Sequence, residues 1–441
     1  MAERPHSPPG LPLVGSALDL GDDPLRFVTG LQRAYGDRYP LVQVDPVTGP
    51  TTNVLVDAGV VHEVLGDRER FRRPNLGPQA GRRQGLISSD GDLWETQREI
   101  IQPEFVGKRL ASYADTTGDA VEALLTEWPE AGECDLLGEI GALTLQVIAR
   151  SLFSYDVTRA ESRRVRNALD TFGEELAFSP LGIVLPDSLQ PGPSTAFEDA
   201  NDALDAFAND VIDRHRARDD PPRNMLAALM AAKRDPSVEL SEDELVDETV
   251  LFLTAGHETT ALTITYAFYW LSQRPDVRRR VRAEADAVLD GDRPGWDDLP
   301  ALEATERVVR ETLRLTPAAW NVIRETRRPV RLGGYRLDEG ELLFASPYAH
   351  GRDPAAWDDP DQFRPERWGA DASRAADSYF PFGSGPRSCV GRQLALIEAQ
   401  FALAGILSRY DVEVLVDEFD FRPAVTLQPT GDVPARLTAR D

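Results

Sequence analysis

A glycine-rich loop that ends in a cysteine and leads directly into a helical pattern constrains this chain more than any other stretch. The loop, residues 380–391, reads FPFGSGPRSCVG, and apolar residues then recur at helical spacing from Val390 to Ile406. Glycine lacks a Cβ and tolerates positive φ, so we expect Gly383, Gly385 and Gly391 to let the loop lie close to a flat partner.

The same pattern places Cys389 at a helix N-terminus, where the helix dipole and free N–H groups favour a thiolate. Such a thiolate ligates a metal or attacks a substrate. A buried cysteine in a glycine-rich turn is the structural alternative. It explains neither the Phe, Gly and Arg at fixed offsets nor the helix start, so we favour the ligand.

Length and composition predict one large domain over residues 1–441. The chain is 41% hydrophobic, and no linker, charge block or repeat interrupts it. The only other cysteine, Cys134, lies far from Cys389 in sequence, which predicts no disulfide framework. The five histidines are scattered, and none forms a ligand pair with a cysteine or another histidine, so a zinc site is not expected.

The charge balance is strongly acidic. A net charge of −26 argues against nucleic acid or an anionic membrane as the main partner. Lys108 and Lys233 are the only lysines, so the acidity reflects either adaptation to high salt (a halophilic protein) or an arginine-rich genome with an ordinary acidic protein. A melting temperature that does not rise with KCl would exclude the first. The N-terminus has no apolar stretch of signal length, and we expect a soluble cytoplasmic protein without a transmembrane anchor.

Along the chain, the pattern is mainly α with small β-sheets, the α+β class. We expect a β-rich part over about 1–70, helices over about 91–320, β pieces and the cysteine loop over about 321–391, and a final helix with strands over 390–441. The predicted elements are a hairpin (39–45 and 52–57), a helix (58–65), a long loop (72–92), helices (113–234), a break that could be a mobile cover (178–197), short strands (330–346) and closing strands (411–416 and 424–427).

The longest predicted helix carries a polar insertion. Ser241 and Glu244 form a plausible capping box before an apolar run from 245 to 271. Within it lies AGHETT, residues 255–260, whose glycine, acid and alcohols weaken an apolar helix, and such a violation usually has a functional reason. Phe252, Ala255 and Thr259 share a face, with Glu258 beside it, so this groove could hold O2 or water. Alternatively, Thr259 bonds back to the carbonyl four residues earlier.

Two further pairs stand at helical spacing. Trp94 and Arg98 share the face of a helix that Asp92 could cap, and together they could hold a carboxylate or form a surface cation–π pair. Glu311 and Arg314 form an i, i+3 ion pair on the helix 302–315. Its apolar flanks indicate burial, and a buried ion pair needs more partners.

Taken together, the chain resembles a cytochrome P-450, a haem-thiolate monooxygenase. The match runs from the lead-in at 8–12 to Leu427, and the intact motifs look more like the eukaryotic-type branch than the camphor-type branch. Five motifs in the family's order carry it: Trp94 and Arg98; Ala255, Gly256, Glu258, Thr259 and Thr260; Glu311 and Arg314; Pro365, Glu366, Arg367 and Trp368; Phe382, Gly385, Arg387, Cys389 and Gly391.

The resemblance implies roles for these residues. Cys389 would be the axial iron ligand of heme b, whose electron donation favours O–O cleavage. Phe382 would pack beside the sulfur, and Ala255, Gly385 and Gly391 would contact the porphyrin. The propionates would be held by Trp94, Arg98, Arg324 and Arg387. A structural triad supporting the loop would comprise Glu311, Arg314 and Arg367.

The implied reaction inserts one atom of O2 into an apolar substrate by hydroxylation or epoxidation. Thr259 would donate a hydrogen bond to the oxygen species at the iron, and Glu258 would relay protons. Electrons would come from NAD(P)H through a separate ferredoxin or flavodoxin-type protein with its reductase, docked near Lys108, Arg109 and Arg392. The substrate pocket would be lined by Leu86, Ile87, Phe252, Val322, Ile323 and Thr426. The alternatives are a non-catalytic haem protein, which needs no proton path, and a thiol hydrolase, which would need a histidine near Cys389.

Overall fold

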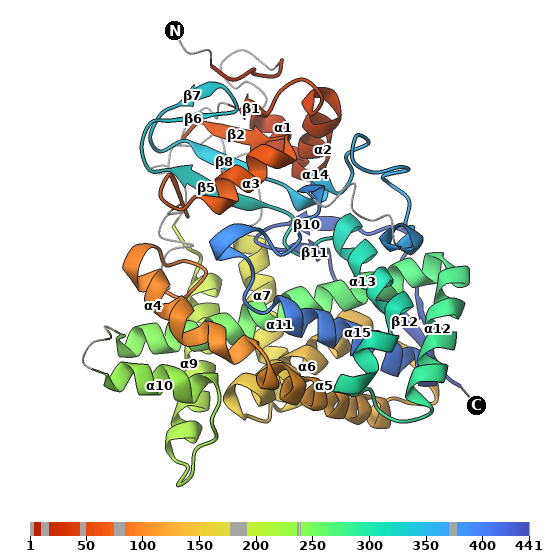
Figure 1. Cartoon of the computed structure of the whole chain (residues 1–441). Helices are drawn as coiled ribbons and strands as arrows, with labels where there is room; N and C mark the ends of the chain where they lie inside the picture. The colour runs from red at the N-terminus through yellow and green to blue at the C-terminus, as the bar shows by residue number, and fades with distance from the viewer. Residues whose placement is uncertain are drawn as a thin grey trace.

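The computed structural model describes residues 4–9, 17–44, 50–74, 84–176, 192–235, 238, 240–369 and 377–440. A sheet-rich lobe that contains the N-terminal elements lies against a larger helical lobe (Figure 1). This is the mainly helical α+β architecture that the sequence predicted. The predicted cover at 178–197 lies mostly outside the described residues, and its last three residues already belong to a helix.

A five-stranded sheet organises the smaller lobe. Its strand order is β1 (Leu41–Val44), β2 (Thr52–Leu55), β8 (Leu342–Ala345), β5 (Val322–Thr326), β3 (Phe71–Arg72). Strands β1 and β2 form the predicted antiparallel pair, whereas β2 and β8 are parallel. The sheet therefore joins strands that lie more than 250 residues apart in sequence. Short helices accompany it: α1 (Ala17–Asp22), α2 (Pro24–Tyr35), α3 (Ala58–Gly66) and α14 (Pro347–His350).

The pairing of β3 with β5 has a consequence for the site. Phe71 faces Thr326 and Arg72 faces Glu325 in antiparallel register. Arg73 follows β3 directly, and Arg324 precedes Glu325 within β5. The pairing thus brings two arginines that are distant in sequence close enough for the charge of Arg73 to lower the pKa of Arg324.

The larger lobe is built from helices. They are α4 (Gly91–Ile101), α5 (Lys108–Glu127), α6 (Leu136–Ile148), α7 (Arg159–Glu175), α9 (Thr195–Arg216), α10 (Met225–Arg234), α11 (Glu242–Gln273), α12 (Pro275–Leu289), α13 (Glu303–Leu315) and α15 (Arg392–Arg409). Within the described ranges, one helical stretch, Leu136–Phe153, is long and apolar enough to cross a bilayer, and most of it is buried inside the protein.

Helix α11 is the centre of this lobe (Figure 1). Its 32 residues span about 48 Å at ~1.5 Å per residue. The predicted capping box is present, since the Ser241 hydroxyl accepts from the Glu244 N–H and the Glu244 carboxylate accepts from the Ser241 N–H. The helix packs against α6, α9, α13 and α15. A Cβ at Gly256 would lie 3.2 Å from Ile148 Cδ1, so this glycine lets α6 approach closely.

Three small sheets complete the fold. They are β4 (Ala131–Asp135), β12 (Pro434–Ala439) and β9 (Tyr410–Val414) in one sheet, the hairpin of β10 (Phe421–Pro423) and β11 (Leu427–Pro429), and the pair β6 (Val330–Leu332) and β7 (Tyr335–Leu337). Two expectations were wrong here. Residues 424–426 form the turn of the hairpin rather than a strand, and β4 interrupts a stretch predicted as helical. The partner of β4 is β12, about 300 residues later, so no local pattern revealed it.

Candidate active site

The cysteine loop is held in shape by its own backbone. The Cys389 N–H donates to the Phe382 carbonyl at 2.9 Å, and the Gly383 N–H donates to the Phe380 carbonyl at 2.9 Å. Gly383 and Gly385 use the conformational freedom of glycine, with φ of +69° and +71°. Gly391 does not, because its φ is −84°. Gly391 instead serves as the N-cap of α15.

Gly385 has a packing role that the sequence did not reveal. A Cβ there would lie 2.3 Å from the Leu65 carbonyl oxygen, so the glycine lets the loop pack directly on the end of α3. A Cβ at Gly391 would meet Phe105 Cε1 at 3.7 Å, which is an ordinary contact. Close packing on α3 and positive φ therefore account for Gly385.

Cys389 lies immediately before α15 with its thiol exposed. Burial nevertheless raises its pKa, while the N–H groups of Gly391 and Arg392 and the charges of Arg98 and Arg392 lower it. The thiol is therefore accessible while protein groups around it still act on its pKa. Burial and neighbouring carboxylates raise the pKa of Cys134 to about 12, so it is a poor thiolate. Of the two cysteines, Cys389 is the better candidate for a metal ligand.

Two arginines from distant segments act electrostatically with Arg387 of this loop. Burial lowers the pKa of Arg73 and of Arg324 to about 10, and the charge of Arg387 contributes to both shifts. Arg324 is 6% exposed, and among the described residues its guanidinium donates only to the Ile323 carbonyl. Neither Arg73 nor Arg324 has an ion-pair partner among the described residues. Arg387 lies over the Trp94 ring at 4.5 Å.

Arg387 and Arg98, which were predicted to hold propionates, also donate hydrogen bonds to protein groups. Arg387 donates to the Asp90 carboxylate and the Ser89 carbonyl, each at 2.8 Å. Arg98 donates to the Ser388 carbonyl at 3.0 Å, which ties α4 to the cysteine loop. Asp90, not Asp92, occupies the N-cap position of α4, without a side-chain cap bond. Its carboxylate also accepts from Arg327.

These donors fit a haem group. The buried Arg324 and the partly buried Arg73 have no ion-pair partner among the described residues, and they create a demand for anionic groups, because buried charges are normally paired. The two propionates of haem would meet that demand, and the Cys389 thiolate would ligate the iron. We therefore assign Cys389 to the iron and Arg73, Arg324, Arg387, Trp94 and Arg98 to the propionate side as a proposal.

The predicted triad is assembled in the core. Arg314 contacts Glu311 in a bidentate pair, with Nε and Nη2 at 2.9 and 2.8 Å from the carboxylate oxygens. Arg367 Nε donates to the same carboxylate at 3.0 Å, as do the Trp368 indole at 2.9 Å and the Arg364 N–H at 2.8 Å. The side chains of Glu311 and Arg314 are fully buried. Arg314 also donates to the carbonyls of Gly351, Pro360 and Gln362.

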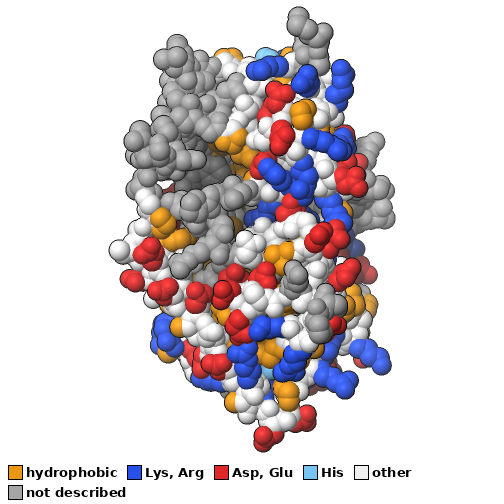
Figure 2. Space-filling model, turned by 90° about the vertical axis from the view of Figure 1, so that its left-hand side faces the viewer, with side chains coloured by type: hydrophobic (Ala, Val, Ile, Leu, Met, Phe, Trp, Pro, Cys, Tyr) orange, Lys and Arg blue, Asp and Glu red, His pale blue; other side chains and the backbone are white. Residues whose placement is uncertain are grey.

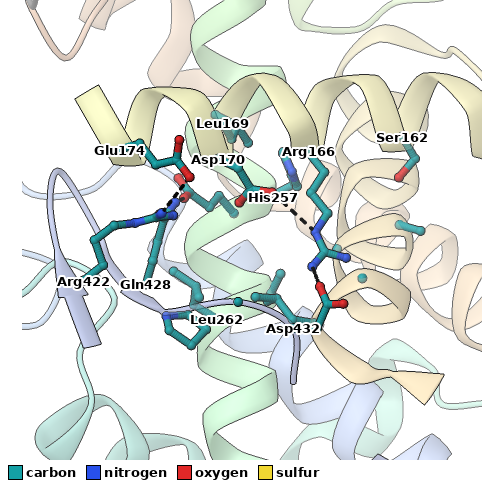
Figure 3. Close-up of a pocket in the computed structure, with 18 residues that line it drawn as sticks. Ser162, Arg166, Leu169, Asp170, Glu174, His257, Leu262, Arg422, Gln428 and Asp432 are labelled. Carbon is teal, nitrogen blue, oxygen red and sulfur yellow. Dashed lines mark hydrogen bonds and ion pairs between the residues drawn. The ribbon is translucent and has the colours of Figure 1, made fainter. Parts of the chain in front are cut away.

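On α11, the acid and the alcohol point to different sides. Thr259 Oγ1 donates to the Ala255 carbonyl at 3.0 Å, the back-bond weighed as an alternative from the sequence. The Glu258 carboxylate accepts from Thr426 Oγ1 at 3.1 Å and from the Gln428 amide. Glu258 lines a cavity of about 190 Å³ between α6, α7, α11 and the β10–β11 hairpin (Figure 3). Burial raises its pKa.

The predicted substrate-pocket residues do not form one wall. Leu86 and Phe252 belong to the same buried cluster, in which Phe252 stacks on Phe105. Ile87 is 44% exposed. Val322 and Ile323 alternate across β5 and pack in two different clusters of the sheet lobe. Thr426 donates a hydrogen bond to Glu258.

The predicted docking patch is smaller than expected. Arg109 is paired with Glu104 at 3.0 Å and donates to the Arg223 carbonyl. Lys108 and Arg392 are exposed, and Arg392 lies 5.7 Å from the Phe382 ring centroid. On the face shown in Figure 2, basic and acidic side chains are interspersed rather than separated.

Sequence reasoning missed Arg73, Asp90 and Gln428. Arg73 stands in an Arg-Arg-Pro run that could have marked it as a candidate, since a basic pair in a predicted loop suggests an anion site. Gln428 has no local signal. Its contact with Glu258 joins residues 170 positions apart.

Comparison with known proteins agrees with this geometry. The cytochrome P450 family model matches residues 5–432. Cyclooctatin synthase from Streptomyces melanosporofaciens is 36% identical over 417 residues, which cover 92% of this chain and 89% of that protein. Pentalenene oxygenase from Streptomyces avermitilis is 33% identical over 98% of this chain and 97% of its own length. Cyclooctat-9-en-7-ol 5-monooxygenase from S. melanosporofaciens is 32% identical, covering 92% and 90%.

A solved structure shows the same architecture. The crystal structure of the cytochrome P450DA heme domain superposes with a TM-score of 0.84 at 26% identity, covering 100% of this chain and 99% of that one. Sequence motifs, a family-wide match and the shared fold lead to one conclusion: the chain is a member of the cytochrome P450 family.

Proposed function

We propose that this haem-dependent monooxygenase oxygenates a terpene-type substrate, with Cys389 as its iron ligand. The observation that carries the site assignment is that Cys389 lies three residues before α15, in the loop whose Arg387 acts electrostatically on Arg73 and Arg324, two arginines without an ion-pair partner among the described residues. The terpene class is supported by relatives named pentalenene oxygenase and cyclooctat-9-en-7-ol 5-monooxygenase.

The reaction inserts one atom of O2 into an apolar substrate, and electrons come from NAD(P)H through a separate redox protein. Haem, when bound, supplies the iron at which O2 is activated. The protein's own part is to hold that group and to supply protons. Cys389 would ligate its iron, and Arg73, Arg324 and Arg387 would pair with its carboxylates.

Thr259 and Glu258, two neighbouring residues of α11, would transfer the protons. The Thr259 hydroxyl donates to the Ala255 carbonyl at rest, and rotation about χ1 would turn it toward an oxygen acceptor. Glu258 is partly exposed to the neighbouring cavity and can exchange protons there. Burial raises the pKa of this carboxyl, so it holds a proton more readily than an exposed glutamate does and can pass it on.

The first test concerns the ligand. Reduced protein with CO should show the red-shifted Soret band of thiolate ligation, and Cys389→Ser should lose it. Cys134→Ser, which changes the other cysteine, is the matched control. Retention of the band in Cys389→Ser would exclude the assignment.

The second test concerns Thr259. Thr259→Ala should release more peroxide and less product per electron consumed. The control is Thr249→Ala, because Thr249 is also buried in α11 and donates to the carbonyl four residues earlier, at 2.8 Å. Equal coupling in the two variants would contradict the role of Thr259.

We further propose a ferredoxin or flavodoxin-type donor that docks near Lys108 and Arg392 of a cytoplasmic enzyme. Both side chains are exposed close to the loop that carries Cys389. Charge reversal in Arg392→Glu should slow reduction by the donor, and an unchanged rate would count against this surface. Binding spectra with a panel of cyclic terpenes and fatty acids would test the substrate class.

A further inference from the structure

The Glu258 carboxyl is held by the β10–β11 hairpin rather than by a neighbour on its own helix. Thr426 Oγ1 and the Gln428 side-chain amide both donate to its Oε1 atom. Its Oε2 atom carries no hydrogen bond from any residue that the structure describes, although the side chain lines the cavity beside α7. One oxygen is therefore fixed, and the other is available for a proton.

Arg422 fixes the orientation of the Gln428 amide. Its Nη2 donates to Gln428 Oε1 at 2.6 Å, and because a guanidinium only donates, the amide oxygen must face it. The NH2 group of Gln428 then faces Glu258. Figure 3 shows Gln428 and Arg422 beside the cavity, with Arg422 paired to Glu174 on α7. Hydrogen bonds therefore link Arg422 to Gln428 and Gln428 to Glu258 on α11.

The hairpin cannot easily move away from α11. The Tyr266 hydroxyl donates to the Leu427 carbonyl, and the Trp320 indole donates to the Ala424 carbonyl at 2.9 Å. On the other side, a Cβ at Gly173 of α7 would lie 2.2 Å from Gln428 Oε1. The absence of a side chain at Gly173 leaves the space that Gln428 occupies.

We propose that Gln428 is a positioning residue for proton transfer: with Thr426, it holds Oε1 of Glu258 so that Oε2 stays open to the cavity as the protonation site. This inference rests on the proton relay proposed above for Glu258. It assigns a role to the hairpin, where sequence reasoning expected a substrate contact at Thr426.

The charges around Glu258 support a tunable carboxyl. Burial and the negative charge of Asp170 on α7 raise its pKa, whereas the Gln428 and Thr426 donors and the charge of Arg422 on β10 lower it. The residues of α6 that line the cavity are uncharged, and Tyr266 lies on the same helix as Glu258 with a raised pKa of its own. The two neutral donors thus lower the pKa of Glu258, which burial raises.

Replacing Gln428 by methionine tests the proposal, since methionine keeps the length but removes the amide donor. Infrared spectra recorded against pH would follow the carboxyl band that Glu258→Gln abolishes. Loss of a hydrogen bond to a charged group should raise the ionisation midpoint by about one to two pH units. The pH profile of product formed per electron should move in the same direction.

Gln400→Met is the matched control. Gln400 is also buried, but its amide donates only to the Leu396 carbonyl within α15, so the midpoint should stay in place. If Gln428→Met does not fold, Thr426→Val removes the other donor to Oε1 and should shift the midpoint the same way.

Different results would overturn the positioning role of Gln428 and the proton relay of Glu258. An unchanged infrared midpoint in folded Gln428→Met, or an equal shift in Gln400→Met, would overturn the assignment of Gln428. Full coupling in Glu258→Gln would instead overturn the relay on which it rests.

Discussion

Replacing Glu311 by glutamine would leave two buried guanidiniums facing a neutral amide. The carboxylate of Glu311 accepts from Arg314 through two bonds and from Arg367 through one, and it also accepts from the Trp368 indole and the Arg364 N–H. The substituted amide keeps the shape of the side chain. It offers one acceptor atom where the carboxylate has two, and it turns an NH2 group toward existing donors.

The expected cost follows from burial. The side chains of Glu311 and Arg314 are fully buried, and Arg367 is 11% exposed, so water cannot replace the lost charge. Removing one partner of a buried ion pair costs about 3–5 kcal/mol. Folded domains are stable by roughly 5–15 kcal/mol, so Glu311→Gln should lose a large share of the free energy of unfolding.

The measurement is denaturant unfolding followed by circular dichroism, with Glu303→Gln as control. Glu303 lies on the same helix, α13, and pairs with Arg307 at 2.9 Å, but its side chain is 69% exposed. An exposed i, i+4 pair is worth only about 0.3–0.5 kcal/mol. A difference of under ~1 kcal/mol between the two variants would refute the argument that burial makes this network essential.

Two further predictions concern other buried charges. Arg73→Met should speed the loss of haem to an excess of apomyoglobin, because it removes a partly buried cation proposed to pair with a propionate, whereas the exposed Arg38→Met should not. The Glu248 side chain is fully buried and has no ion-pair partner among the described residues, and burial raises its pKa to about 8. The folded state then keeps a proton that the unfolded chain releases, so stability should fall as pH rises from the ordinary glutamate value toward 8. Glu248→Gln, compared by thermal melting at roughly pH 5 and pH 9, should gain relative stability at the higher pH, and an equal difference at both would contradict this pKa.

Short-range patterns were predicted well because their physics is local. The Ser241–Glu244 box depends on three-residue spacing at a helix start, and the structure has it. Glu311 and Arg314 are one helical turn apart, and their apolar flanks already indicated burial with additional partners. The loop before Cys389 was placed correctly, and Gly383 and Gly385 in it adopt the positive φ that glycine tolerates.

Expectations failed where a residue's conformation or partner depends on distant chain segments. Residues 424–426 were expected to belong to a strand and instead form the turn of the β10–β11 hairpin. Strand β4 lies in a stretch expected to be helical and pairs with β12, about 300 residues later. The substrate contacts of Val322, Ile323 and Thr426 stay predictions.

By itself, the sequence determined the family, the cysteine ligand candidate and the polar insertion in the long helix, since each is written in a few residues at fixed spacing. Only the tertiary structure decided that Arg73 lies beside Arg324 and that Gln428 holds Glu258. Those contacts depend on strand register and hairpin placement across 170 residues or more. The physical reason is that a buried charge can be satisfied by a donor from any segment, and only the complete packing selects which one.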